Sequence, residues 1–431
     1  MPRSLRRKVS RLLGEAISFI QRPYLRRVRS LPRIRVRSGA PVVGASVELL
    51  PPERVTADRK ANEQLLYFTT PSLFLDETHL VFLSDRTGDP NLFLRNLSSG
   101  REQQLSDNRG GTLKSYVYFT GSPYRGLGMA SPSLHAESGT VYYIQGREIL
   151  QARPSGERKI LATLPADQMT AYTHVSMDGT RLCVPTVDAR ALDGHKRLRG
   201  QPTYGVARRV RQENLFSYLR VYSTADGREL ACEAIPQSWV THVQFSPVNP
   251  DWILYNHEWG RHSGVRRMWL WDGRRHTPLR TEADGRDRRD WVCHEFWSPD
   301  GDSVHYHGRY EDGLDFIGSI RIPGGKPVEI PLPDGWNQYG HYHAATSHSL
   351  VTDGYYRPSR TAGALYGPWL SLVDVDWGDR QITWTPLTAH LTSWRSQDAH
   401  PHPRIDHSGR NAYFTSDRDG KRAVYRVALP R

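Results

Sequence analysis

The stretch QDAHPHP (residues 397–403) places two histidines one residue apart and an amide side chain three residues before the first. Each histidine is followed by a proline, which restricts the backbone and helps to hold the pair in place. Imidazoles with an amide and without a thiolate suit a borderline divalent ion such as manganese, zinc, iron or nickel. The spacing therefore predicts that Gln397, His400 and His402 contribute to a metal site.

Other histidines stand at a matching position, just ahead of a turn and a β-rich run. They are His174, His242, His294 and the pair His341 and His343. If the positions are structurally equivalent, these side chains converge although they lie far apart in the sequence. Polar residues that merely line a wet channel mouth would produce the same pattern.

The elements that must position these residues are repeated β-hairpins. HLVFLSDRTG (79–88) and NAYFTSDRDG (411–420) each combine an apolar strand, an Asp/Gly turn and the start of a second strand. Five further copies begin at residues 136, 177, 246, 298 and 343. Seven units spaced by about 40–70 residues are typical of propeller blades. We predict an all-β fold, a seven-bladed β-propeller with loops at 186–214 and 354–368.

The positive charge is concentrated at one end of the chain. Residues 1–40 hold 12 Lys+Arg and one acid, Glu15, so most of the net charge of +13 lies there. This segment can form an amphipathic helix suited to an anionic surface, or it is a solvated leader. We expect an arginine-rich extension over residues 1–45, partly helical or disordered, and a propeller over 46–431. The nearly neutral propeller argues against a nucleic-acid partner.

The cysteines and the lack of a targeting pattern predict a cellular compartment. Cys183, Cys232 and Cys293 are odd in number and widely spaced, which is typical of a reducing compartment without a disulfide framework. The sequence shows neither a clear secretory signal nor an apolar run that could span a bilayer. We therefore expect a cytoplasmic protein.

A divalent metal beside histidines and arginines is compatible with two reactions, hydrolysis by a metal-bound water and proton abstraction beside a carboxylate. Arginine binds carboxylates in bidentate fashion, so Arg266 and Arg267 favour an acidic substrate. Alternatively, Arg267 is a surface residue of a strand without a functional role, and its aliphatic stem packs on Trp269.

Hydrolysis usually requires a carboxylate near the histidines, and two are available. Glu258 and Glu295 directly follow His257 and His294. Neighbouring residues of a strand point to opposite faces, so we expect neither carboxylate to share a site with its histidine.

Together, these motifs resemble those of the oligogalacturonate lyases, which are seven-bladed propeller polysaccharide lyases. The similarity runs from about Val47 to the C-terminus, and CHEFWSPDG (293–301) and QDAHPHP (397–403) are its most specific stretches. THVQFSP (241–247) and RMWLWDG (267–273) also match. The chain departs from the family at residues 64–66, where Gln-Leu-Leu replaces a His-Arg-Asn run.

The resemblance implies a divalent metal cofactor, typically manganese, held by His341, Gln397, His400 and His402. It further implies that His294 is the Brønsted base, which abstracts the proton from carbon-5 of a uronate in a β-elimination. The expected activity is that of a metal-dependent lyase acting on short uronate oligosaccharides, such as unsaturated digalacturonate, in pectin degradation.

The resemblance also implies that Arg267 assists by binding or neutralising the acidic substrate. His242, His257 and Arg266 are then expected to contact the acidic oligosaccharide. The alternative is a non-catalytic, TolB-like propeller that binds a ligand or partner at its channel mouth. The propeller half of a serine oligopeptidase is disfavoured, because no α/β-hydrolase pattern with its nucleophile elbow follows.

Overall fold

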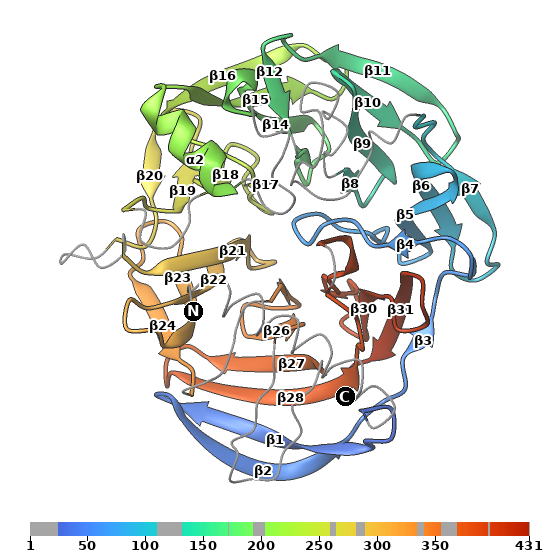
Figure 1. Cartoon of the computed structure of the whole chain (residues 1–431), viewed down its shortest axis with the longest axis vertical. Coiled ribbons are helices and arrows are strands. Elements are labelled where there is room, and N and C mark those ends of the chain that lie inside the picture. The colour runs from blue at the N-terminus through green and yellow to red at the C-terminus, as the bar shows by residue number, and fades with distance from the viewer. Residues whose placement is uncertain are drawn as a thin grey trace, which may run out of the picture. The chain divides into compact units, whose positions relative to one another are not determined.

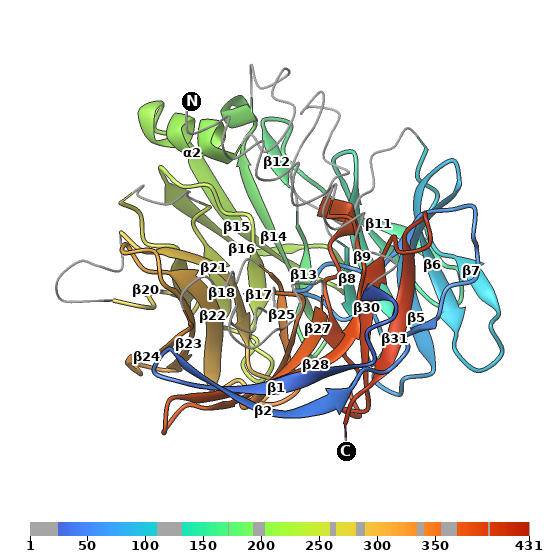
Figure 2. The same ribbon diagram turned by 60° about the horizontal axis from the view of Figure 1, so that its bottom comes forward.

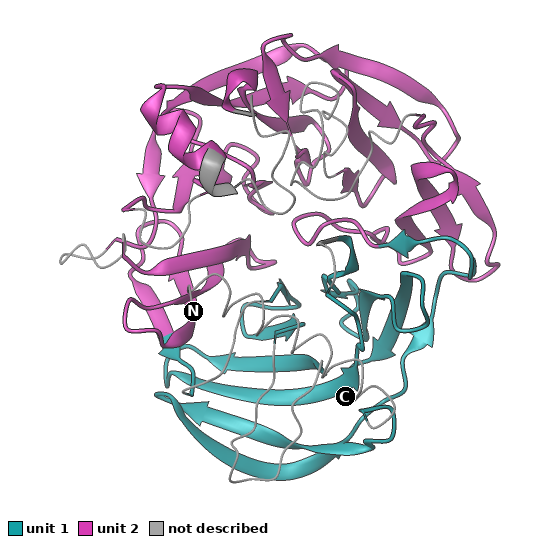
Figure 3. Cartoon of the chain, viewed as in Figure 1, with its two compact units in different colours: residues 1–64, 330–431 teal, residues 65–329 magenta. Residues whose placement is uncertain are grey.

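The structure is a computed structural model. It describes residues 25–109, 132–170, 172–192, 203–258, 264–281, 289–333, 340–354, 369–394 and 397–430. Within these ranges the chain consists mainly of antiparallel strands (Figure 1). It divides into two compact units, residues 1–64 with 330–431 (unit 1) and residues 65–329 (unit 2) (Figure 3). None of the helices formed by described residues combines the length and apolar character that a bilayer span requires.

Unit 2 contains five antiparallel sheets that follow one another along the chain. The first two sheets are formed by β5 (His79–Thr87), β6 (Asp89–Asn96) and β7 (Glu102–Gln104), and by β8 (Ser133–His135), β9 (Thr140–Gln145), β10 (Glu148–Ala152) and β11 (Arg158–Thr163). The third is formed by β12 (Gln168–Thr170), β13 (His174–Val175), β14 (Arg181–Asp188), β15 (Phe216–Ser223) and β16 (Glu229–Pro236). The last two are formed by β17 (Val243–Phe245), β18 (Ile253–Asn256), β19 (Met268–Trp271) and β20 (His276–Pro278), and by β21 (Trp291–Trp297), β22 (Ser303–Arg309), β23 (Asp315–Arg321) and β24 (Pro327–Pro331).

Unit 1 contains two sheets. One has the order β2-β1-β28-β27-β26-β25 and is formed by β1 (Ser30–Arg37), β2 (Ala40–Glu48), β25 (Tyr342–Ala344), β26 (Ser349–Thr352), β27 (Trp369–Asp376) and β28 (Gln381–Ala389). The other is formed by β29 (Arg404–Ile405), β30 (Asn411–Ser416), β31 (Ala423–Ala428) and β3 (Glu53–Arg54). The short strand β4 (Glu63–Gln64) precedes the boundary between the units.

Each predicted repeat coincides with one of these sheets. The apolar run of every copy forms a strand that lies between two others in its sheet: β5, β9, β14, β18, β22, β26 or β30. The Asp-Gly turns that precede β14 and β22 contain Gly179 and Gly301, whose φ angles of +70° and +72° suit a residue without a Cβ atom. The prediction of an all-β, seven-bladed β-propeller is confirmed, because the seven sheets are its blades.

The apolar faces of consecutive sheets form the core. In unit 2, Leu219 and Val221 of β15 pack in one buried cluster with Val243 and Phe245 of β17. Burying one such side chain stabilises the fold by about 1.5–3 kcal/mol. The core therefore fixes the first strand of each sheet, and with it the residues that lie at the beginning of that strand.

The structure differs from the sequence expectation in residues 30–48, which form the hairpin β1–β2 rather than a helical or disordered extension. Leu31, Ile34 and Val36 are buried, while Arg35 and Arg37 between and beyond them are exposed. This alternation is typical of a strand with one buried face, and β1 pairs with β28. The helix expected further upstream falls on residues 1–24, which lie outside the described residues.

The insertion over residues 186–214 also differs, because part of it is helical rather than a loop. It contains the 3-10 helix η3 (Ala189–Leu192) and the helix α2 (Thr203–Gln212), which lies at one end of the sheet β14–β16 (Figure 2). Val206 and Val210, four residues apart, are buried on one face of α2. Asn214, with a φ of +51°, follows the helix end, where a left-handed residue is common. The other expected loop, 354–368, lies almost entirely outside the described residues.

Candidate active site

Three of the four predicted metal ligands converge in unit 1. His341 directly precedes β25, and His400 and His402 precede β29. Each of the three imidazoles offers one ring nitrogen, and these three nitrogens lie within 4.8 Å of one another. All three side chains are buried. The Trp394 ring packs against His400 with 4.4 Å between the ring centroids.

The carboxylate of Asp353 orients this histidine cluster. It accepts hydrogen bonds from the backbone N–H of His341 at 2.5 Å and from that of His402 at 3.2 Å. Its Oδ2 atom also lies 3.1 Å from Nδ1 of His341. A carboxylate on one ring nitrogen fixes the tautomer of a histidine and makes its other nitrogen, here Nε2, the better metal ligand.

Backbone geometry supports the same arrangement. A Cβ atom on Gly340 would lie 2.7 Å from the backbone of Gly354 and 2.8 Å from Oδ1 of Asp353. The close approach of the two chain segments therefore requires glycine at position 340. His402 has a φ of +45°, a conformation that a non-glycine residue adopts at a cost and that occurs often at functional sites. The fold thus holds the cluster in a specific geometry.

The donor set fits a divalent ion. Burial, and then the neighbouring His341 and His400, lower the pKa of His402 well below its usual value, which keeps the imidazole neutral. Neutral imidazole is the form that binds metals. The fourth predicted ligand, Gln397, belongs to the 3-10 helix η7 (Gln397–Ala399), but its side chain lies outside the described part of the chain.

His294, the predicted base, lies in unit 2 on β21 and is buried. A β-bulge between Cys293 and Phe296 interrupts the pairing with β22, and His294 has a φ of +49°. Its Nδ1 lies 2.9 Å from Nε2 of the fully buried His307, so one of these two imidazoles donates to the other. A bulge of this kind re-aims a side chain away from the regular alternation of a strand.

Arg267, also in unit 2, is buried within a polar network. Its Nε donates to Oε2 of Glu295 at 2.8 Å, and its Nη1 donates to Oε2 of Glu258 at 3.3 Å. Its Nη2 lies 3.1 Å from Nδ1 of His242 and 3.5 Å from Oε1 of Glu295. Nε2 of His242 lies 3.4 Å from the hydroxyl of Tyr67. Among the described residues, the four contacts of Arg267 use four of its five guanidinium N–H donors and leave one for another acceptor.

Charge in this network is fixed by mutual stabilisation. Burial opposes ionisation of Glu295, but Arg267 and His242 outweigh it and lower its pKa to about 2. Burial likewise disfavours the charged form of Arg267, but Glu295 and Glu258 raise its pKa well above the usual value. The arginine is therefore a permanent cation, and Glu295 is an anion at neutral pH.

The other predicted substrate contacts have separate surroundings. His257 stacks on Trp269 with 5.3 Å between the centroids, and burial and then His276 lower its pKa to about 4. Arg266 is half-buried, and its carbonyl accepts a hydrogen bond from the indole of Trp269. His257 and Arg266 thus both contact Trp269.

A second group of potential ligands, Cys293, His294 and His307, overlaps the predicted base. Burial raises the pKa of the Cys293 thiol to about 12, whereas metal binding needs the thiolate. The three-histidine cluster of unit 1 is therefore the better metal site, and the His294–His307 pair is better suited to proton transfer.

Several residues of these clusters were not found by sequence reasoning. His307, Asp353 and Tyr67 were assigned no role, and Glu258 and Glu295 were considered only as hydrolytic carboxylates. Glu295 and His294 do take different partners, although the bulge rather than strict alternation separates them. His307, Glu295 and Asp353 share one signal, a buried polar side chain on a β-strand or directly after one, which requires a partner.

The fold and the buried histidine cluster define a β-propeller with a candidate divalent-metal site. Comparison with known proteins extends this description. No protein-family model matches the chain. It is 28% identical over 212 residues to an oligogalacturonide lyase of Pectobacterium atrosepticum and 26% identical over 211 residues to an oligogalacturonate lyase of Dickeya dadantii. Each match covers 44% of this chain and 50% of the relative, so the chain spans about half the length of the curated relatives it matches.

Solved structures agree over a longer range. An oligogalacturonate lyase in complex with manganese superposes with a TM-score of 0.68 at 21% identity, covering 94% of this chain and 98% of that one. An oligogalacturonate lyase from Vibrio parahaemolyticus gives a TM-score of 0.67 at 19% identity with the same coverage. At these identities the structures show the common propeller fold. The predicted resemblance to oligogalacturonate lyases is confirmed by the sequence matches, and the propeller fold by the solved structures.

Proposed function

We propose that this protein is a metal-dependent lyase that cleaves short uronate oligosaccharides by β-elimination. Oligogalacturonate, and unsaturated digalacturonate in particular, is the expected substrate. The observation that carries the proposal is the buried cluster of His341, His400 and His402, oriented by Asp353. His400 and His402 belong to the QDAHPHP motif, which resembles that of this class of enzyme. The similarity to proteins named oligogalacturonate lyases supports the same reaction.

His294 is the proposed base. If its Nδ1–H donates to Nε2 of His307, the Nε2 lone pair of His294 can accept a proton. In the reaction, the proton on carbon-5 moves to His294, a double bond forms between carbon-4 and carbon-5, and the bond from carbon-4 to the leaving oxygen breaks. The leaving oxygen takes up a proton, and an unsaturated uronate results. His307 acts as a positioning residue that fixes the tautomer of the base.

Arg267 supplies a permanent positive charge and one remaining N–H donor for the uronate carboxylate. Glu295 and Glu258 hold the guanidinium in one orientation, so little is lost in ordering it when substrate binds. His242, fixed between Arg267 and Tyr67, is a proposed substrate contact. His257, which directly follows β18, and Arg266, which lies shortly before β19, are also proposed to contact the substrate.

The predicted ligand set would hold a divalent ion, with manganese as the first choice, and the fourth ligand would be Gln397. When bound, such an ion supplies positive charge that polarises the uronate carboxylate and stabilises the charge that develops as carbon-5 loses its proton. The three buried imidazoles would hold the ion in surroundings where electrostatic interactions are stronger than in water.

Two variants separate the base from the metal site. We expect His294→Ala to abolish turnover of oligogalacturonate while bound manganese, measured by elemental analysis, stays at the wild-type level. We expect His341→Ala to lose both manganese and turnover. Loss of manganese in His294→Ala would show that a ligand has been taken for the base. Full activity of His341→Ala would refute the metal assignment, and a protein without turnover or stoichiometric metal would favour a binding propeller.

The setting of the reaction is also a proposal. The three cysteines are unbridged, and two of them are buried, which suits a reducing compartment. We infer that the protein acts in the cytoplasm on imported oligosaccharides from pectin, and that the arginine-rich extension contacts an anionic surface. The acidic oligosaccharide is then the partner of the propeller, and nucleic acid is not.

A further inference from the structure

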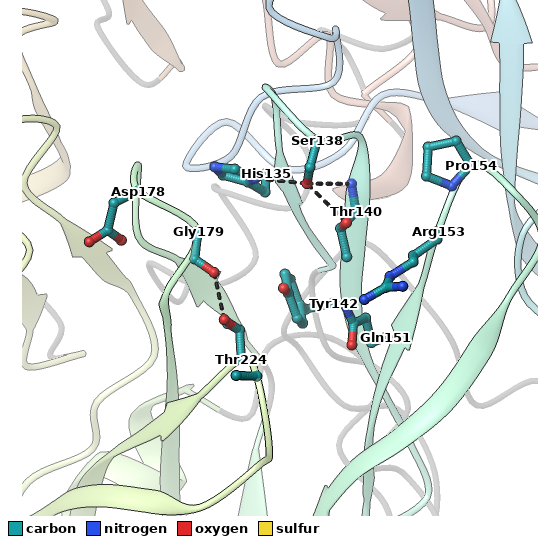
Figure 4. A pocket seen from close by; sticks show the side chains of 11 residues that line it. His135, Ser138, Thr140, Tyr142, Gln151, Arg153, Pro154, Asp178, Gly179 and Thr224 are labelled. Atoms are coloured by element: carbon teal, nitrogen blue, oxygen red, sulfur yellow. Dashed lines mark hydrogen bonds between the residues drawn. The ribbon is translucent and has the colours of Figure 1, made fainter.

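Beyond the three-histidine cluster of unit 1, the described residues contain one further group of three metal-ligating side chains, Cys293, His294 and His307. All three lie in unit 2, on β21 and β22. One potential ligand atom of each lies within 4.8 Å of those of the other two. The pocket of about 420 Å³ elsewhere in unit 2, which Arg153 and Asp178 help to line, contains none of them (Figure 4). The proposed base and its imidazole partner are therefore also part of a potential metal site.

The distances in this group suit a small tetrahedral ion. Nδ1 of His294 and Nε2 of His307 face each other at 2.9 Å. An ion with bonds of about 2.0–2.1 Å to both nitrogens would hold them about 3.3–3.4 Å apart, so the two rings need to separate by only about 0.4–0.5 Å. The same ion would hold a cysteine sulfur about 3.6 Å from each nitrogen, which is compatible with the observed limit of 4.8 Å.

The neighbouring charges favour a cation at this position. Glu295 and Glu258 contact Arg267 at 2.8 and 3.3 Å, and two carboxylates with one guanidinium give the network a formal charge of −1. Burial raises the pKa of the Cys293 thiol to about 12, while Arg267 lowers it and the two glutamates raise it, so the thiol lies within the electrostatic field of this network. A thiol that binds a metal ion loses its proton outright, so the raised pKa is overcome once the ion is bound.

The thiol distinguishes this group from the cluster of unit 1, which contains histidines only. Thiolate ligands select soft or borderline ions such as Zn²⁺ and do not suit Mn²⁺. The two groups therefore favour different ions. A soft ion can bind beside Cys293 while manganese stays with the three histidines.

We propose that Cys293, His294 and His307 bind a soft divalent ion such as Zn²⁺ or Cd²⁺, and that this ion inhibits the proposed lyase reaction. Binding releases the thiol proton to water, and the ion takes the lone pairs of Nδ1 of His294 and Nε2 of His307. The hydrogen of the neutral His294 ring then resides on Nε2, so this nitrogen can no longer accept the proton from carbon-5. The inhibition rests on the proposed function, whereas binding of the ion does not depend on it.

Cadmium is the probe, because a thiolate bound to Cd²⁺ produces an ultraviolet charge-transfer absorbance that imidazole ligands do not produce. The manganese-loaded full chain is titrated with Cd²⁺, and this absorbance, the retained manganese and the turnover of oligogalacturonate are measured on the same samples. We expect the wild type to gain the absorbance and to lose turnover at least about tenfold while it retains its manganese.

Cysteine variants locate the site. Cys293→Ser should lack the absorbance and should need at least about tenfold more Cd²⁺ for the same loss of turnover, because it lacks the thiolate ligand. Cys293→Ala serves as a second variant if the serine variant does not fold. Cys232→Ser removes an exposed cysteine and is the matched control, which should keep both the absorbance and the inhibition.

Different results would overturn the two parts of the proposal. Absence of the absorbance in the wild type, or its persistence in the Cys293 variants, would overturn the site. Equal inhibition of the wild type and Cys293→Ser, or inhibition that follows the loss of manganese, would overturn the inhibitory role. Absence of turnover before Cd²⁺ is added would instead contradict the proposed lyase function, and the absorbance would still test the site.

Discussion

Replacing Glu295 by glutamine tests the buried network around Arg267 most sharply. The pKa of Glu295 is lowered from 4.5 to about 2 because, although burial opposes ionisation, Arg267 and His242 favour the carboxylate. At about 1.4 kcal/mol per pKa unit, this displacement corresponds to roughly 3 kcal/mol of stability at neutral pH. Breaking one partner of a buried ion pair typically costs about 3–5 kcal/mol, and Glu258 still compensates Arg267 in part. We therefore expect Glu295→Gln to lose roughly 3 kcal/mol.

The pH dependence of this loss provides the assay. Because the folded-state pKa of Glu295 is lowered, its contribution is present above pH 4.5 and is lost as the pH falls toward 2. Urea unfolding of both proteins at neutral pH and at steps below pH 4.5 should show a gap that narrows with acidification. Turnover of Glu295→Gln should fall on the order of 100-fold, because Arg267 and His242 lose their orientation.

The control is Glu53→Gln, which removes a partner of Arg426 at a position where the glutamate side chain is 63% exposed. An exposed pair contributes only about 0–1 kcal/mol, so this variant should unfold nearly like the wild type. A Glu295→Gln variant as stable as the Glu53→Gln control would refute the reasoning. A stability gap that stays constant on acidification would also refute it, because the ionised carboxylate would then not be its source.

Three further variants probe the positioning residues. His307→Phe removes the acceptor of His294, so kcat should fall and the pH–rate profile should shift while bound manganese is unchanged; an unaltered profile would contradict a role in proton transfer. Asp353→Asn should weaken manganese binding about 10–100-fold, as titrated by competition with a chelator, since the carboxylate orients His341. Gly340→Ala would place its Cβ 2.8 Å from Oδ1 of Asp353, so both the manganese affinity and the melting temperature should decrease; wild-type values for both would disprove the tight approach.

The blades were predictable because their signal is local. Apolar alternation and the Asp-Gly turns around Gly179 and Gly301 determine strand and turn without reference to distant residues. The hairpin β1–β2 was missed because arginines dominate the composition of the segment. Its strand pattern is nonetheless present in Leu31, Ile34 and Val36, of which the last two pair with β28, more than 300 residues away.

The candidate site was predictable where its residues are close in sequence, as for His400 and His402. Asp353 could not be assigned from spacing, since it lies 12 residues from His341 and 49 from His402. The register of β25 with β26 brings it opposite His341, and the sequence alone does not specify that register. The contact between Arg267 and Glu295 could not be predicted for a related reason. Side-chain directions were inferred from the regular alternation of a β-strand, and a β-bulge before Phe296 breaks this alternation.

One measurement directly tests the proposal that the chain is a metal-dependent lyase of uronate oligosaccharides. Metal-stripped and manganese-reloaded protein is incubated with saturated and unsaturated oligogalacturonates, and the ultraviolet absorbance and product masses are followed. We predict that unsaturated or 4-deoxy-keto uronates form with the reloaded protein and do not form with the stripped protein. Absence of these products while manganese is bound would contradict the lyase assignment.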